Sequence, residues 1–134
     1  MKKERTLMAF MLSRMDVGHT PPIKYLPATA SEDVALGEAL VLSAGKLTKC
    51  GATAKPSFVA VGPKNAAGEA PVIAVQDYMT FETTLQAAGT DLKIGSKVTL
   101  HTDGLQVTAT TASGVAEIVR MDGTAVGSGV LVKF

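Results

Sequence analysis

Residues Gly37–Cys50 read Gly-Glu-Ala-Leu-Val-Leu-Ser-Ala-Gly-Lys-Leu-Thr-Lys-Cys, and this stretch has the pattern of a β-hairpin. Leu40 and Leu42 alternate with their neighbours, which is the period of a strand. Ser43-Ala44-Gly45 then supplies a turn in which the glycine can adopt a positive φ. The residues after the turn return as a second strand, so the stretch predicts two paired antiparallel strands.

The same pattern recurs at residues 95–109, which read Gly-Ser-Lys-Val-Thr-Leu-His-Thr-Asp-Gly-Leu-Gln-Val-Thr-Ala. In both copies a glycine leads, and an aliphatic residue and then a leucine follow at the same offsets: Leu40 and Leu42, Val98 and Leu100. A further glycine, Gly45 or Gly104, opens the return strand. We therefore expect two related hairpins, one in each half of a small β-domain.

Further short segments with strand character are separated by turns rich in Gly, Pro and Asn, at spacings of about 8–14 residues. They are 57–62, 72–76 (with Pro71 marking its start), 79–85 (half-buried), 115–121 and 129–134. Between them, Leu92 and Ile94 are expected to tuck beneath the loop 86–94. The series predicts an all-β fold, a small β-barrel or sandwich of short antiparallel strands, with residues 31–134 as its body.

Residues 1–30 differ from this body and are expected to form an N-terminal arm. Met8, Met11, Leu12 and Met15 fall at positions i, i+3, i+4 and i+7, which predicts a short amphipathic helix. A helix this short is marginal in water unless its apolar face is covered. Three outcomes remain open: the segment packs on its own domain, docks on a partner, or stays disordered.

The second part of the arm, residues 17–30, has the composition of an extended segment. Pro21 and Pro22 fix φ and force the preceding residue into an extended conformation, and Ile23 and Tyr25 follow with alternating character. Prolines at both ends exclude a central strand. We expect this stretch to lie along a surface as an edge strand.

The charge is unevenly distributed although the whole chain carries only +1. Residues 1–26 hold five basic and two acidic residues, a balance of +3, and the remainder holds eight against ten, a balance of −2. A basic arm on a mildly acidic body suits an acidic neighbour, including a second copy of the chain. Ordinary solvation of a terminal segment explains the same pattern equally well.

The sequence contains no pattern typical of a catalytic or metal site. The single cysteine, Cys50, is expected to pack as a small hydrophobic residue. His19 and His101 lack partners at metal-ligand spacing, and Asp103 lies in a Gly-containing turn where it satisfies backbone donors. Aromatic residues are not interleaved with basic ones as nucleic-acid binding would require. We expect no enzyme, no cofactor, no metal and no nucleic-acid partner.

Neither a membrane span nor a secretory signal is expected. The longest apolar run near the N-terminus, Leu7–Leu12, is six residues long, against the roughly 18 needed to cross a bilayer. Arg14 follows quickly and no small-residue cleavage pattern closes the run.

In its organisation the chain resembles the capsid decoration, or head-stabilising, proteins of tailed bacteriophages. The resemblance covers about residues 20–134 and is carried by the arm ending in Thr20-Pro-Pro-Ile23 and by a body rich in Ala, Gly, Thr and Val. It is also carried by three phrases: Gly37-Glu-Ala-Leu-Val-Leu42 followed by Lys46-Leu-Thr-Lys-Cys50, Ser57-Phe-Val-Ala-Val-Gly62, and Gly95-Ser-Lys-Val-Thr-Leu100. The segment 1–16 departs from the shorter arms of lambda-type members.

The resemblance implies a structural virion protein, made in the host cytoplasm, that binds the outer surface of the expanded capsid. It would be a homotrimer that clamps neighbouring subunits of the major capsid protein. The hypothesis places the capsid contact within residues 7–27, and a chain lacking them should fold but no longer decorate shells. The expected contact residues are Met8, Met11, Leu12, Met15, Pro21, Pro22, Ile23 and Tyr25.

Two alternatives stay open at this point. The chain could be another β-rich virion component, such as a tail-tube or head-tail joining protein. It could also be a free-standing small β-barrel that binds a ligand or nucleic acid. Oligomeric state and retention on a nucleic-acid resin at low salt distinguish these classes.

Overall fold

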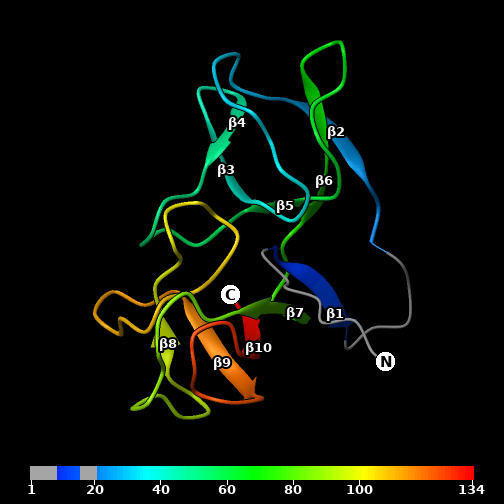
Figure 1. Cartoon of the computed structure of the whole chain (residues 1–134). Coiled ribbons are helices and arrows are strands. Elements are labelled where there is room, and N and C mark those ends of the chain that lie inside the picture. Colours follow the sequence, from blue (N-terminus) through cyan, green and yellow to red (C-terminus); the bar gives the residue numbers. More distant parts are fainter. Residues whose placement is uncertain (1–8, 16–20) are drawn as a thin grey trace, which may run out of the picture.

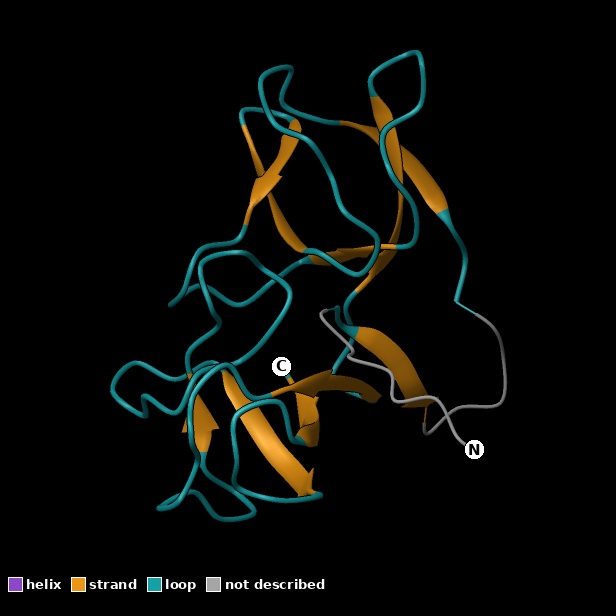
Figure 2. Cartoon of the chain, in the orientation of Figure 1, coloured by secondary structure: helices purple, strands orange, loops and turns teal. Residues whose placement is uncertain are grey.

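Two five-stranded antiparallel sheets make up the computed structural model of the chain, which describes residues 9–15 and 21–134 (Figures 1 and 2). The residues described contain ten strands and no helix. The predicted all-β fold is confirmed in its sandwich-like form. A closed barrel, which the sequence left open, does not form from these strands.

Sheet 1 has the strand order β1-β7-β10-β9-β8. Its strands are β1 (Met11–Met15), β7 (Met79–Thr84), β8 (Lys97–Val98), β9 (Ala116–Met121) and β10 (Gly129–Lys133). The last strand along the chain, β10, therefore lies at the centre of the sheet, between β7 and β9. The strands predicted at 115–121 and 129–134 correspond to β9 and β10.

Sheet 2 has the order β2-β6-β5-β3-β4 and occupies the upper part of Figure 1. Its strands are β2 (Lys24–Pro27), β3 (Ala39–Ser43), β4 (Lys46–Lys49), β5 (Phe58–Ala60) and β6 (Glu69–Ala74). The sheet curls so far that its two edge strands approach each other beyond the end of β2. There Ala28 forms a single bridge with Leu47, and the Thr29 amide donates to the Leu47 carbonyl at 2.9 Å.

Alternation along the strands of sheet 2 divides the apolar residues between two cores. Leu40, Ala60 and Val72 face the inside of the curl, in a small core with Ala28, Val34, Leu47 and Ala70. Their neighbours Ala39, Val59 and Ile73 face sheet 1, in a larger core. Both faces of these strands are therefore apolar, and the side chains of the larger core hold the two sheets together.

The first predicted hairpin is confirmed and the second is only partly regular. In the first, β3 pairs with β4 from Leu40–Lys49 to Ser43–Lys46, and Gly45 has a φ of 79° in the turn. In the second, β8 has only two residues and pairs with β9. The return chain is joined to the first segment by the antiparallel bridge Leu100–Val107 and by backbone hydrogen bonds on either side of it, such as that from His101 to Gln106.

Three smaller predictions need correction. The strand predicted at 72–76 is β6, which begins at Glu69, so Pro71 lies inside it, and the Pro71 carbonyl accepts from Val61 just beyond β5. Strand β7 is not half-buried as predicted: Thr80 and Thr84 on its other face are buried too, and the Gln106 side chain covers Thr84 with a hydrogen bond. Leu92 is buried as expected, but Ile94 is 72% exposed.

The predicted N-terminal helix is wrong for the residues described. Met11–Met15 is strand β1, which pairs with β7, and the register shifts between Leu12 and Arg14. This bulge brings Leu12 and Met15, three residues apart, against the same core, a spacing that imitates a helix. Both described parts of residues 1–30 are thus strands, β1 in sheet 1 and β2 in sheet 2.

Phe10, just before β1, is the residue that fixes the N-terminal segment to the body. It is 1% exposed, and its ring meets that of Phe134 edge-on at 5.3 Å between centroids. Its amide donates to the carbonyl of Gly37 at 2.9 Å. Gly37 has a φ of 81°, and a Cβ there would meet Ala9, so only glycine allows the segment to pass this closely.

Candidate interaction surfaces

The outer edge of β2 presents a short apolar stretch to solvent. Ile23 and Tyr25 are 57% and 58% exposed, and Pro22 beside them is exposed as well. Pro21 is half-buried. Sheet order confirms the predicted edge strand for Lys24–Pro27, because β2 pairs only with β6 in sheet 2.

The pairing register decides which backbone groups of β2 point away from the sheet. Tyr25 lies opposite Pro71, whose carbonyl is directed toward β5, so the pair does not exchange hydrogen bonds. The amide and carbonyl of Tyr25 therefore face the outer edge. Thr29, on the same side of the strand, confirms this direction, since its amide bonds to Leu47 of β4. The described residues provide no such partner for Tyr25.

The contact residues expected from the sequence do not form one surface. Leu12 and Met15 pack partly buried against the larger core, and Met11 is 37% exposed at the edge of sheet 1. Met8 lies outside the residues described. Tyr25 belongs to β2 of sheet 2, and Ile23 lies just before this strand. Of the predicted set, Leu12 and Met15 of β1 therefore contribute to the core, whereas Ile23 and Tyr25 are exposed to solvent.

An ion pair between the buried Glu38 and the exposed Lys49, at the base of the first hairpin, is a feature that the sequence analysis missed. Glu38 is 1% exposed, and its Oε2 accepts a hydrogen bond from Lys49 Nζ at 2.9 Å. Its Oε1 accepts from the Ala35 amide at 3.0 Å. The pKa of Lys49 is raised chiefly by its hydrogen bond to Glu38; desolvation opposes the rise, and the negative charges of Glu38, Glu32 and Asp103 add to it.

A second carboxylate fixes the same strand to the preceding loop. Glu32 accepts hydrogen bonds from the Thr48 hydroxyl at 2.7 Å and from the Lys49 amide at 3.1 Å. Because every oxygen of the two carboxylates has a partner in the fold, this cluster stabilises the hairpin. The sequence analysis missed this cluster because it depends on the pairing of Leu40 with Lys49, and that register cannot be read from sequence spacing alone.

Two side chains with potential reactivity, Cys50 and Asp103, are hydrogen-bonded to the backbone. The Cys50 thiol is buried and donates to the Ala54 carbonyl at 3.0 Å, and burial raises the pKa of Cys50 to about 11. A thiol in this state is a poor nucleophile. Asp103 accepts from the Leu105 amide at 2.8 Å, as its turn position predicted. Among residues 9–15 and 21–134, no three His, Cys, Asp or Glu side chains are placed to hold a metal ion.

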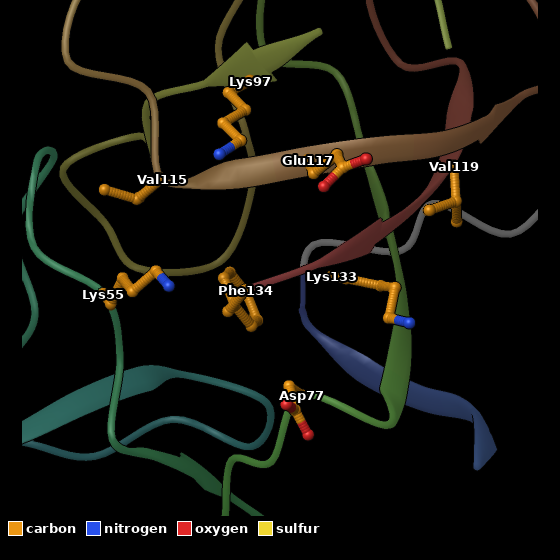
Figure 3. A pocket seen from close by; sticks show the side chains of 8 residues that line it. All are labelled: Lys55, Asp77, Lys97, Val115, Glu117, Val119, Lys133 and Phe134. Carbon is orange, nitrogen blue, oxygen red and sulfur yellow. The ribbon is translucent and has the colours of Figure 1, made fainter. Parts of the chain in front are cut away.

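Hollows lined by charged side chains lie along β9 and β10 of sheet 1. One cavity of about 400 Å³, shown in Figure 3, lies beside Phe134 and is lined by Lys55, Lys97, Lys133, Asp77 and Glu117 together with Val115 and Val119. In this view Lys55 and Lys97 reach toward the space beside Phe134, whereas Lys133 points away from them. A second hollow shares Val119 and Lys133 with this cavity, and a third shares Arg120 and Leu131 with the second.

No helix among the residues described is long and apolar enough to span a membrane. No protein-family model matches the sequence, and neither the curated proteins nor the solved structures contain a significant match to it.

Proposed function

We propose that the chain is a structural assembly protein that decorates the outer surface of a tailed-bacteriophage capsid. In this role it acts as a homotrimer and joins neighbouring subunits of the major capsid protein. The observation that carries the proposal is the outer edge of β2, where an exposed apolar pair flanks backbone groups directed away from the sheet. The resemblance of residues 20–134 to decoration proteins indicates that the partner is the major capsid protein.

The edge suits the addition of one short strand from a neighbour. The Tyr25 amide and carbonyl supply a donor and an acceptor for a ladder, and the Tyr25 and Ile23 side chains supply apolar area beside it. Pro27 has no amide hydrogen, and Thr29 already bonds to β4, so the added strand is limited to the start of β2. The limit favours a specific contact over open-ended association.

One such contact is weak, and repetition makes the attachment firm. Three copies of the edge in a trimer would engage three capsid subunits at once, which raises the effective concentration of the second and third contacts. Among the residues described, every buried side-chain nitrogen and oxygen has a hydrogen-bond partner. To join neighbouring capsid subunits, the protein requires a well-packed body whose exposed strand edges bind them.

Cosedimentation with expanded, undecorated shells of the phage that carries this gene tests the proposal. Tyr25→Pro removes the outward amide without breaking a bond to β6, and Tyr25→Ala removes only the side chain. We expect Tyr25→Pro to abolish cosedimentation and Tyr25→Ala to weaken it about tenfold or more. Leu36→Ser is the matched control, because Leu36 is 52% exposed and lies outside β2.

Two results would overturn the proposal. Wild-type chain that stays in the supernatant at micromolar concentration shows that the shell is not its partner. Full retention of Tyr25→Pro on the shells shows that the β2 edge does not make the contact. Light scattering on the purified chain adds the oligomeric state, for which a trimer is expected.

A further inference from the structure

Two Asp-Gly pairs occur in the sequence, Asp103-Gly104 and Asp122-Gly123, and the fold constrains them differently. In such a pair the glycine amide nitrogen follows the aspartate directly and has no Cβ beside it, so the nitrogen can attack the side-chain carboxyl carbon. Hydrogen bonds that hold either group slow this reaction, because they must break before the two atoms meet. The structure therefore decides which of the two pairs reacts.

The reacting groups of the first pair are both held by hydrogen bonds. The Gly104 amide donates to the His101 carbonyl at 2.9 Å, and Asp103 Oδ1 accepts from the Leu105 amide at 2.8 Å. Gly104 is also buried, and a Cβ built on it would lie 3.0 Å from the Glu38 side chain. The amide nitrogen of this pair therefore cannot turn toward the carboxyl carbon without breaking both hydrogen bonds.

The second pair lies at the start of the loop that joins β9 to β10 (Figure 1). The described residues provide no hydrogen-bond partner for the Gly123 amide. The Asp122 side chain is 62% exposed and lies 3.6 Å from Arg120, which is exposed as well, so this ion pair holds the carboxyl group only weakly. The Asp122 amide donates to the Gly129 carbonyl at 2.9 Å, and that bond involves neither reacting group.

We infer that the folded chain forms isoaspartate at Asp122. The Gly123 nitrogen bonds to the side-chain carboxyl carbon of Asp122, and the carboxyl hydroxyl leaves with the amide proton as water, which closes a succinimide ring. Water then adds to the main-chain carbonyl carbon of Asp122 and breaks its bond to the Gly123 nitrogen. The water lost in the first step is regained in the second, so the mass is unchanged and no oxidant or reductant is needed.

The product changes both the backbone and the chemistry of the loop. The backbone now passes through the side chain of residue 122, which adds one carbon next to Met121, whose pairing with Val130 ends the ladder between β9 and β10. The α-carboxylate of residue 122 becomes free. Protein isoaspartyl methyltransferases transfer a methyl group from S-adenosylmethionine to such a carboxylate, so the aged loop is a substrate site for this class of enzyme.

The inference concerns the loop between β9 and β10 and is independent of the β2 edge and of the proposed capsid role. It is tested by keeping the purified full chain at neutral pH and body temperature for several weeks. Electron-transfer mass spectrometry of peptides then locates isoaspartate, and methylation with labelled S-adenosylmethionine measures its amount. We expect isoaspartate to accumulate about tenfold faster at residue 122 than at residue 103, because two hydrogen bonds must open at the first pair.

The same chain kept in urea is the control for the fold. Once unfolding removes the hydrogen bonds of Asp103 and Gly104, both Asp-Gly pairs should form isoaspartate at similar rates. Asp122→Glu keeps the negative charge but requires a larger ring that closes slowly, so this variant should lose the folded-state methylation signal. Asp103→Glu is the matched variant and should accept methyl groups at the wild-type rate.

Three results would overturn the inference. Equal accumulation at the two positions of the folded chain would show that the hydrogen bonds do not select the site. The same preference for residue 122 in urea would assign the selection to neighbouring residues in the sequence and not to the fold. A methylation signal that persists in Asp122→Glu would place the reaction at another residue.

Discussion

The first thirty residues contribute one edge strand to each sheet, and the two strands use their apolar side chains in opposite ways. Strand β1 directs Leu12 and Met15 into the larger core, next to the buried Phe10. At β2, by contrast, Tyr25 within the strand and Ile23 just before it are more than half exposed. The N-terminal segment thus consists of one strand that contributes to the core and one strand whose apolar side chains are exposed to solvent.

The largest expected effect tests the structural half of this contrast. Phe10→Ala removes a ring that is 1% exposed and packs against Phe134, so we expect a loss of about 3–5 kcal/mol in the free energy of unfolding. Tyr25→Ala, in the exposed strand, should change it by about 0.5 kcal/mol or less. Urea unfolding followed by circular dichroism measures both. Similar losses in the two variants would show that the strands do not differ in this way.

This contrast also changes the best design of a binding experiment. A chain lacking residues 7–27 would lose Phe10 and the whole of β1, which are parts of sheet 1 and its core. Loss of binding in that chain would not distinguish a missing contact from an altered fold. Point substitutions in β2 keep the body intact and are the sharper test.

The next effect concerns the glycine over which the N-terminal segment passes. Gly37→Ala combines a positive φ with a contact against Ala9, and should cost about 3 kcal/mol of unfolding free energy. Gly45→Ala is the control, since Gly45 has a similar φ of 79° but no atom within 4 Å of the added Cβ. Its cost should be about 1 kcal/mol, which is backbone strain alone. Equal costs would mean that the approach of Ala9 contributes nothing.

The smallest effect is a pH dependence located in sheet 2. Burial raises the pKa of Cys50 from 9.0 to about 11, so the folded state keeps its proton over a range in which the unfolded state loses it. Stability from this source is complete below pH 9 and is lost as the pH rises through 11, by about 2 kcal/mol. The wild type minus Cys50→Ala difference in unfolding free energy, measured from pH 8 to 11, isolates it. A difference that does not change with pH would contradict the burial of the thiol.

Much of sheet 2 and the centre of sheet 1 could be predicted from alternation and turn residues. Gly45 marked the turn of the first hairpin, the prolines around β2 marked an edge strand, and Gly129 marked the start of β10. These features are local, because a period of two or a positive φ is set by adjacent residues.

The sequence-based predictions failed where the structure depends on pairing between residues far apart in the sequence. The spacing of Met11, Leu12 and Met15 indicated a helix, but pairing with β7 and a bulge produce the same spacing in a strand. Glu38 and Lys49 gave no sign of their ion pair, because it depends on the register of two strands. The hollow lined by Arg14, Arg120 and Lys133 likewise combines β1, β9 and β10, and no local pattern connects those segments.

The central position of β10 in sheet 1 has a consequence for how the chain reaches its native state. Strand β10 separates β7 from β9, and Leu12 of β1 must find Phe81 across 81 minus 12, or 69, residues of chain. Sheet 1 therefore cannot assemble on the ribosome before residues 129–133 emerge, whereas the first hairpin can close as soon as Lys49 is free. Such long-range closure predicts folding on the millisecond-to-second scale, with the hairpin of sheet 2 structured first.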